Sequence, residues 1–470
     1  MRFGKRESIS FLNAFMQKES FSVAVLGQGT VGSEVIKVLH QNHDELNDTA
    51  GKSIQLEAIH RREPKKAITD QDDNKYNRVV YTQSPYLYKS IDEIIGDENI
   101  DCVCELMGGI DDARDAIQRA LQSGKHVVSA NKALFASHWP EFVKLAEQHN
   151  VQLRFEAAVA GGIPILNALA EGSASENIHQ LRGIVNGTTN FILTEMERKG
   201  ADYADALKEA KRLGYAEADE SADVLGHDAC QKLSLLIAHA FGKHIPPEDI
   251  PTMGINHVSL KDIEQASSMG CRIKLVGRAE QVDGNIIARV GPELVIADSP
   301  LGLVPKNLNA VEVKSNLNQK GNFYQGEGAG GKSTASSVLT DIVNIARHSD
   351  QGFVSPFGRS VNSARNNPDV RNHAFYIRFV IRDAVGVVHD MTGVLKKYDI
   401  SLNSIVQLPY PEGEREHLPF FITVEDTTEE NLKKALDEIS GLSFNVEQPH
   451  YLRFERDDMW VQHDADTVDS

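Results

Sequence analysis

Short apolar runs alternate with segments of helical spacing in the first third of the chain. The run FSVAVL at 21–26 leads directly into GQGTVG and then into a stretch whose apolar residues recur every three or four positions. Further apolar runs at 54–59, 101–106 and 126–130 are separated by helical patterns. Strands that alternate with helices predict a parallel sheet with helices on both faces. We therefore expect an α/β dinucleotide-binding domain of the Rossmann type over 21–150.

The rhythm changes after this domain. From 151 to 330, glycine-rich turns carrying polar side chains alternate with strand patterns, and two helical stretches occur at 202–213 and 226–242. This pattern predicts a second α/β domain. A further helical pattern follows at 333–348.

The C-terminal part has a different organisation. Residues 349–372 mix Gly, Pro, Ser and Asn without periodicity, which is typical of a linker. Between 373 and 456 the patterns read strand, helix, strand, strand, helix, strand, and this βαββαβ order predicts a ferredoxin-like module. The acidic segment 457–470 is expected to be a frayed tail.

Composition narrows the classes of protein. Apolar residues make up 41% and charged residues 25%, as in ordinary globular proteins, and no apolar run is long enough to span a bilayer. Residues 1–20 lack a continuous apolar core and a cleavage site, so we interpret them as a short extension. A net charge of −18 argues against a nucleic-acid partner. Four cysteines without C-x-x-C pairing favour reduced thiols in the cytoplasm.

The first glycine-rich turn has the G-x-G-x-x-G spacing of dinucleotide-binding loops. Gly27 would form the tight turn, Gly29 would let the backbone approach a pyrophosphate, and Gly32 would let helix and strand pack closely. Thr30 and Val31 lie inside the same loop. The alternative is an ordinary turn between a strand and a helix.

The second strand ends in basic residues where such domains usually carry an acid for the ribose. Arg61 and Arg62 could bind a 2′-phosphate bidentately, so we expect NADP to be preferred over NAD. The alternative is that both arginines are solvated surface residues. Glu63 follows them, and an acid near this position could bind the ribose of NAD, so NAD also remains a candidate cofactor.

Polar residues in the middle of the chain suggest chemistry. Lys132 follows a buried strand, at the edge where doubly wound sheets bind ligands, although a surface lysine at a helix start has the same spacing. Glu156 precedes a turn whose carbonyls could help it hold a hard cation, or it is simply hydrogen-bonded. Asp228 and Lys232 are four apart on an apolar helix and share a face. They form either a surface ion pair or a proton-transfer pair, because burial lowers the pKa of an ammonium group and acids tune it.

Residues 326–333, GEGAGGKS, match the phosphate loop of nucleotidases as a string. A nucleotidase would carry a long hydrophobic strand before the loop, and the preceding KGNFYQ is short and polar. We therefore expect Lys332 and Ser333 to be incidental.

In combination, these motifs closely resemble homoserine dehydrogenase over nearly the whole chain. GTTNFIL and the D-V-x-G-x-D-x-x-x-K-L spacing are far more specific than a glycine loop. The segments that carry the resemblance are GQGTVG, ELMGG (105–109), VVSANKAL (127–134), EAAVAGGIPI (156–165), GIVNGTTNFIL (183–193), GYAEAD with SADVLGHDACQKL (214–233) and GEGAGGKSTASSVLTDIV (326–343).

The resemblance implies reversible hydride transfer between NAD(P)H and aspartate 4-semialdehyde, giving L-homoserine for threonine, isoleucine and methionine synthesis. Lys232 falls on the position of the general acid/base, and Lys132 on a lysine near cofactor and substrate. Glu217 and Asp228 fall on positions that bind the amino end of the substrate, with Asp223 in support.

The resemblance also implies a bound monovalent cation, usually sodium, held by Glu156 and by the carbonyls of Val159, Gly161 and Ile163. Gly330 of the second glycine loop would touch the cofactor.

On this resemblance, 151–330 would bind substrate and form the dimer, with 333–348 completing the first domain. A homodimer or homotetramer is expected, without a nucleic-acid or membrane partner.

The βαββαβ unit resembles an ACT domain, which implies feedback inhibition by threonine. Asp383 and Gly386 follow its first strand, where an amino acid would bind. A module that only dimerises is the alternative. Two further readings remain: another ACT-bearing NAD(P) oxidoreductase of amino-acid metabolism, which would lack GTTNFIL, and a non-catalytic sensor, which would lack Lys132, Asp228 and Lys232.

Overall fold

The computed structural model describes residues 20–41, 43–61, 87–217, 219–407 and 417–454. They divide into two compact units, each built from separate stretches of the chain. Unit 1 extends to Asn177 and includes Ser234–Pro247 and Gly326–Ser363, whereas unit 2 comprises Ile178–Leu233, Glu248–Gln325 and the chain from Ala364 onwards. The expected extension lies outside the described residues except for Ser20, and the expected tail lies wholly outside them.

Unit 1 contains the predicted parallel sheet. Within the described residues this sheet has five strands in the order β2-β1-β3-β4-β5. All of its neighbouring strands run parallel. The strands are β1 (Ser20–Leu26), β2 (Ser53–His60), β3 (Cys102–Glu105), β4 (His126–Ser129) and β5 (Leu153–Arg154).

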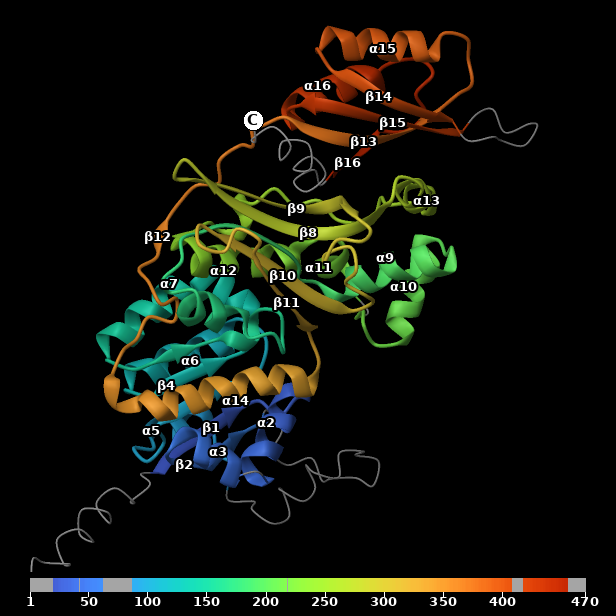
Figure 1. Cartoon of the computed structure of the whole chain (residues 1–470). Helices are drawn as coiled ribbons and strands as arrows, with labels where there is room; N and C mark the ends of the chain where they lie inside the picture. Colours follow the sequence, from blue (N-terminus) through green and yellow to red (C-terminus); the bar gives the residue numbers. More distant parts are fainter. Residues whose placement is uncertain (1–19, 42, 62–86, 218, 408–416, 455–470) are drawn as a thin grey trace, which may run out of the picture. The chain divides into compact units, whose positions relative to one another are not determined.

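Helices cover this sheet, and the last of them comes from far along the sequence. Apolar residues of α14, among them Val338 and Ile342, share one core with Val23, Val25 and Ile36 of the first β-α segment. Figure 1 shows α14 running beside α2 and α3. The helices of unit 1 are α2 (Thr30–Gln41), α3 (His43–Ala50), α5 (Ile91–Gly96), α6 (Asp111–Gln122), α7 (Lys132–Gln148), α8 (Ile165–Asn167) and α14 (Gly331–His348).

Unit 2 is built on a larger sheet. Within the described residues it has nine strands in the order β11-β10-β6-β8-β9-β16-β13-β15-β14. The strands are β6 (Ile178–Ile184), β8 (Cys271–Val282), β9 (Asn285–Ile296), β10 (Leu308–Ser315), β11 (Asn322–Glu327), β13 (His373–Ile381), β14 (Ser401–Gln407), β15 (Leu418–Thr427) and β16 (His450–Phe454). Its first helices are α9 (Gly187–Lys199), α10 (Tyr203–Arg212), α11 (Ser221–Val224) and α13 (Leu260–Ser268), and α12 (His227–Phe241) begins in this unit.

The last part of unit 2 has the predicted βαββαβ order. It consists of β13, α15 (Val387–Lys397), β14, β15, α16 (Glu429–Ser440) and β16. Figure 1 shows α15 and α16 on the same side of these strands, over a core that includes Phe375, Phe379, Leu395 and Leu436. The module extends the larger sheet, because β16 pairs in parallel with β9.

The predicted linker at 349–372 is more ordered than its composition suggested. It includes the short strand β12 (Asn362–Ser363), which pairs with β7 (Lys243–His244). Asn366 then binds the backbone of Ala288 through both its amide oxygen and its amide nitrogen. Hydrogen bonds from an asparagine side chain to the backbone therefore order this segment. Such bonds leave no apolar periodicity in the sequence, so the pattern could not predict them.

Four single-turn segments complete the described elements: η2 (Glu156–Ala158), η3 (Ala168–Gly172), η4 (Pro247–Asp249) and η5 (Ser349–Gln351). No helix in the described ranges is long and apolar enough to cross a membrane.

Candidate active site

Lys232 and Asp228 form a buried ion pair on α12 in unit 2. Lys232 Nζ lies 2.8 Å from Asp228 Oδ2 and donates a second hydrogen bond, of 2.7 Å, to the carbonyl oxygen of Val185. The two residues are 8% and 3% exposed, which rules out the alternative of a solvated surface pair. An ammonium group carries three donors, so one N–H of Lys232 remains for another acceptor.

Asn186 connects Asp228 to a second acid. Its side-chain amide donates to Asp223 Oδ1 at 2.7 Å and to Asp228 Oδ2 at 2.9 Å. Its side-chain oxygen accepts from the Thr189 backbone N–H and thereby caps the start of α9. Sequence reasoning did not single out Asn186. The sequence offered one indication of its position, because an asparagine that follows an apolar strand and precedes a helix is a typical N-cap. Such a cap usually has only a structural role.

Glu217, which the resemblance placed beside the substrate, is exposed and has none of the described hydrogen bonds that join Asp228, Asn186 and Asp223. The structure thus brings Lys232, Asp228 and Asp223 together and leaves Glu217 outside this cluster.

A tight turn presents Asp228. Gly226 has φ +86°, and an added Cβ would lie 2.9 Å from Thr252 Cγ2. Its N–H donates to the carbonyl oxygen of Asp223, which closes the turn between α11 and α12. Only glycine combines this backbone conformation with such close packing, so the start of α12 is fixed by its neighbours.

The first glycine loop in unit 1 has the geometry that its spacing predicts. Gly27 has φ +103°, and a Cβ there would lie 2.4 Å from the carbonyl oxygen of Leu106. A Cβ at Gly32 would lie 2.0 Å from the carbonyl oxygen of Gly27, whereas one at Gly29 would meet nothing within 4 Å. Thr30 and Val31, the first residues of α2, directly follow Gly29 in the sequence. The loop therefore fits a dinucleotide phosphate.

Further polar groups lie at the same edge of the sheet, where β1 and β3 are neighbours although β2 intervenes in sequence. Doubly wound sheets bind ligands at such a switch point. Glu105, at the end of β3, is fully buried and accepts bonds from the Ser129 hydroxyl and the Met107 N–H. Burial raises its pKa, and these bonds oppose the rise. Sequence reasoning noted Glu105 only within the motif ELMGG.

Lys132 is the first residue of α7 and is half-buried. Asn131 caps this helix by accepting from Leu134 N–H, and its amide donates to the carbonyl oxygen of Gly109. Lys132 belongs to unit 1, whereas the Lys232 cluster belongs to unit 2.

The second glycine loop lies against the first. Gly331, the first residue of α14, is so close to α2 that a Cβ would lie 3.0 Å from the carbonyl oxygen of Thr30. Gly330 precedes it with φ +126°. Lys332 is exposed, and the Ser333 hydroxyl bonds locally to the carbonyl oxygens of Ala329 and Gly330. GEGAGGKS is therefore part of the wall of the dinucleotide loop.

Arg61 directly follows β2 and is half-buried. Arg62 lies outside the described residues.

Glu156 is buried beside a second carboxylate. Its oxygens accept from the N–H groups of Leu166 and Asn167, and its own N–H donates to Asp341 Oδ2 at 2.9 Å. Burial and the charge of Asp341 raise the pKa of Glu156 to about 8, and burial raises that of Asp341 to about 7. Sequence reasoning missed Asp341. A bound cation would relieve the repulsion between two such carboxylates, so the residues fit a hard monovalent ion.

The expected carbonyl ligands lie on the turn that follows. Gly161 O accepts from the Ser337 hydroxyl at 2.6 Å, and Ile163 O accepts from Ile165 N–H at 2.7 Å. Val159, which lies between Glu156 and Gly161 in the sequence, is fully buried. No group of three or more His, Cys, Asp or Glu that could hold a metal occurs among the described residues, so a cation here would depend on carbonyl oxygens.

The expected effector loop is open to solvent. Asp383 is exposed, and Gly386, with φ +97°, begins α15 with nothing within 4 Å of an added Cβ.

Comparisons with known proteins agree with this geometry. A family model described as homoserine dehydrogenase matches residues 164–343, and one described as homoserine dehydrogenase, NAD binding domain, matches residues 27–156. A homoserine dehydrogenase of Corynebacterium glutamicum is 36% identical over 93% of this chain and 96% of its own length.

Solved structures extend the similarity to the fold. A homoserine dehydrogenase from Thiobacillus denitrificans is 34% identical with a TM-score of 0.81, over 93% of this chain and 98% of its own. A hyperthermophilic archaeal homoserine dehydrogenase in complex with NADPH is 29% identical with a TM-score of 0.56, over 69% of this chain and 97% of its own.

Proposed function

The chain belongs to the homoserine dehydrogenase family and is a nicotinamide-dinucleotide-dependent oxidoreductase that acts on a CH–OH group. From this premise we propose which residues carry the reaction, which cofactor is preferred and how the enzyme is regulated.

Lys232 is the general acid/base of the reaction. Two of its N–H donors are used by Val185 and Asp228, and the third is available for the oxygen of the reacting carbon. The dinucleotide supplies and accepts the hydride. When aspartate 4-semialdehyde is reduced, the Lys232 ammonium donates a proton to the developing alkoxide, and in the reverse direction the neutral amine takes the proton from the hydroxyl of homoserine. This third N–H is the observation that carries the assignment.

Asp228 and Asp223 bind the ammonium group of the substrate. Asn186 donates to both carboxylates, which fixes their spacing. Two fixed carboxylates attract an ammonium group and orient the chain of the amino acid toward Lys232. Glu217 completes the binding of the amino end from its exposed position, so Glu217→Gln should raise the KM for homoserine at unchanged protein stability. An unchanged KM would exclude this role.

Lys132, at the N-terminus of α7, acts near cofactor and substrate. Gly27, Gly29, Thr30, Val31 and Gly32 form the phosphate loop. Gly330 contacts the cofactor from the second glycine loop, where the next residue, Gly331, packs against Thr30.

NADP is preferred over NAD. Arg61 directly follows β2, the strand after which dinucleotide-binding domains contact the ribose, and Arg62 comes next in the sequence. Guanidinium groups at this point suit a 2′-phosphate. The archaeal relative in complex with NADPH supports this preference. In a variant with both arginines replaced by Ala, the KM for NADPH should rise much more than the KM for NADH. Equal changes in the two constants would contradict the preference.

Glu156 holds a monovalent cation, probed as sodium, together with the carbonyl oxygens of Val159, Gly161 and Ile163. The two adjacent buried carboxylates, Glu156 and Asp341, support a site for positive charge. The cation would stabilise the turn between β5 and α8 without taking part in proton transfer.

The βαββαβ module is an ACT domain through which threonine inhibits the enzyme, and the chain works as a homodimer or homotetramer in the cytoplasm. Buried free thiols in the described chain suit a reducing compartment. Homoserine oxidation by the full chain should decline as L-threonine is added, and activity that stays constant would refute the inhibition. The full chain is needed because removing the module would expose the β9 edge.

A further inference from the structure

Glu105, the last residue of β3, is bonded to two chain segments at the carboxyl edge of the parallel sheet. These are the loop 106–109, which follows β3, and the turn 129–131, at the end of β4. The Glu105 side chain is 0% exposed. Met107 N–H donates to its Oε1 and the Ser129 hydroxyl to its Oε2, both at 2.8 Å. Burial raises the pKa of the carboxyl group, and hydrogen bonds from the same two segments oppose this rise. Because a buried carboxylate without such bonds is costly, Glu105 ties the two segments together.

The loop 106–109 supports the first glycine loop. Leu106 N–H donates to the carbonyl oxygen of Leu26 at 2.7 Å, which continues the pairing of β3 with β1. A Cβ at Gly27 would lie 2.4 Å from the carbonyl oxygen of Leu106 and 2.8 Å from Met107 Cα. Gly27 therefore packs directly on the backbone that Glu105 holds through the Met107 N–H. A shift of this backbone would displace the glycine loop, since the contact leaves no free space.

The turn 129–131 leads to Lys132. The Ser129 hydroxyl that donates to Glu105 also accepts from the Asn131 N–H at 3.1 Å. The Asn131 side chain caps α7, and its amide donates to the carbonyl oxygen of Gly109 in the other segment. Lys132 is the first residue of α7. Its position thus depends on Glu105 through two hydrogen-bonded residues.

We propose that Glu105 is a positioning residue that fixes both the first glycine loop and Lys132 for the reaction. Because its side chain is fully buried, it acts through Met107 on one side and through Ser129 on the other, and not by contact with the substrate. The part that concerns Lys132 rests on the proposed role of that lysine. The part that concerns the glycine loop does not.

Glu105→Gln in the full chain tests the proposal. Glutamine keeps the shape and one acceptor oxygen, but it replaces the other oxygen by an amide group that only donates. The Kd for NADPH, measured by fluorescence titration, should rise about 10- to 100-fold, because small displacements of positioning groups have effects of this size. The kcat with aspartate 4-semialdehyde at saturating NADPH should fall by a similar factor. A merely structural residue would lower the melting temperature and leave both constants of the folded enzyme unchanged.

Ser129→Ala is the second variant, and it removes only the hydroxyl between Glu105 and Asn131. It should lower kcat more than it weakens NADPH binding, because it acts on the branch that leads to Lys132. In the double variant with Glu105→Gln, the loss of kcat should be smaller than the product of the two single losses, since both substitutions break one network. Wild-type kcat in Ser129→Ala, or a double-variant loss equal to that product, would overturn this branch.

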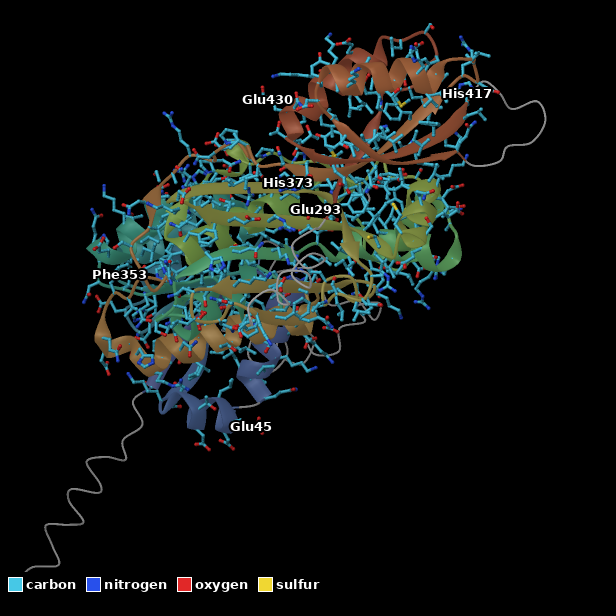
Figure 2. The ribbon with its side chains drawn as sticks, turned by 45° about the horizontal axis from the view of Figure 1, so that its top comes forward. Glu45, Glu293, Phe353, His373, His417 and Glu430 are labelled. Carbon is cyan, nitrogen blue, oxygen red and sulfur yellow. The ribbon has the colours of Figure 1, made fainter. Side chains whose placement is uncertain are left out.

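Two controls remove a carboxylate from the same unit. Asp101 directly precedes β3 at the opposite end of the strand, where it accepts from Ser22 N–H at 2.7 Å. Glu45 on α3, labelled in Figure 2, is exposed. Asp101→Asn should lower the melting temperature, and both Asp101→Asn and Glu45→Gln should keep the wild-type Kd and kcat. The proposal is overturned if folded Glu105→Gln keeps both wild-type constants, or if Asp101→Asn reproduces its losses.

Lys132→Ala separates this proposal from the proposed function. Wild-type kcat in Lys132→Ala would refute the proposed role of Lys132, whereas a raised Kd for NADPH in Glu105→Gln would still support the action of Glu105 on the glycine loop. If Lys132→Ala loses kcat and Glu105→Gln does not, the role of Lys132 stands and its dependence on Glu105 is refuted.

Discussion

Replacing Asn186 by Ser isolates the bridge between Asp223 and Asp228. Serine keeps an oxygen that can cap α9, because Ser is among the preferred N-cap residues, but it removes the amide that donates to both carboxylates. The variant therefore tests the positioning of the acids more than the integrity of the helix.

The expected loss follows from the hydrogen bonds that are removed. A hydrogen bond to a charged group contributes about 1.5–3 kcal/mol. Asp228 keeps Lys232 as a partner, so only its bond to Asn186 is lost at the proton-transfer pair. A loss of this size in transition-state stabilisation lowers kcat/KM about 10- to 100-fold. Most of the change should appear in the KM for homoserine, since the carboxylates bind its ammonium group.

Steady-state homoserine oxidation, followed by dinucleotide reduction, measures this effect. The matched control is Asn190→Ser on the same helix, where the buried amide donates to the carbonyl oxygens of Val304 and Leu308. The control should lose thermal stability while keeping its kcat/KM. Wild-type kcat/KM in Asn186→Ser, or an equal loss in the control, would refute the reasoning.

Three further outcomes are expected. Gly32→Ala should weaken dinucleotide binding at least tenfold and lower the melting temperature, because its Cβ would lie 2.0 Å from the Gly27 oxygen, while Gly29→Ala should leave the melting temperature unchanged. Lys332→Ala should keep turnover within about twofold of the wild type, and calorimetry should detect no ATP binding. A large loss of turnover, or ATP binding, would support the hypothesis that GEGAGGKS is the phosphate loop of a nucleotidase. The pKa of Glu156 is raised from 4.5 to about 8, so the folded state holds a proton that the unfolded state has released, and stability falls as the pH rises through this window. Melting temperatures in sodium-free buffer should decline over that range and decline less with sodium; a flat profile without sodium would contradict the carboxylate pair.

Periodicity was enough to predict the elements whose partners are near in sequence. The parallel strands follow from short apolar runs that alternate with helical patterns, and the βαββαβ order follows from the succession of strand and helix patterns in the last part of the chain. The joint between β16 and β9 could not be predicted in this way, because it pairs Arg453 with Glu293 across a large sequence separation. No local pattern encodes which edge a strand will extend.

The site was predictable in part for similar reasons. The four-residue spacing of Asp228 and Lys232 predicts a shared helix face, and the structure has them paired. Asn186 and Asp341 act through partners 42 and 185 positions away, so only the fold reveals them. Glu217 differs from these two residues, because the motif identified it in advance. Its side chain is nevertheless exposed in the structure.

The role of Lys232 is the central claim, and Lys232→Met tests it most directly. Methionine keeps the volume of the buried chain and removes the proton donor. In NADPH oxidation with aspartate 4-semialdehyde, kcat should fall about 10²- to 10⁴-fold, as for the loss of a general acid, with the KM for NADPH unchanged. Lys208→Met, at an exposed position on α10, serves as the control and should keep wild-type activity. Undiminished kcat in a folded Lys232→Met enzyme would contradict the assignment.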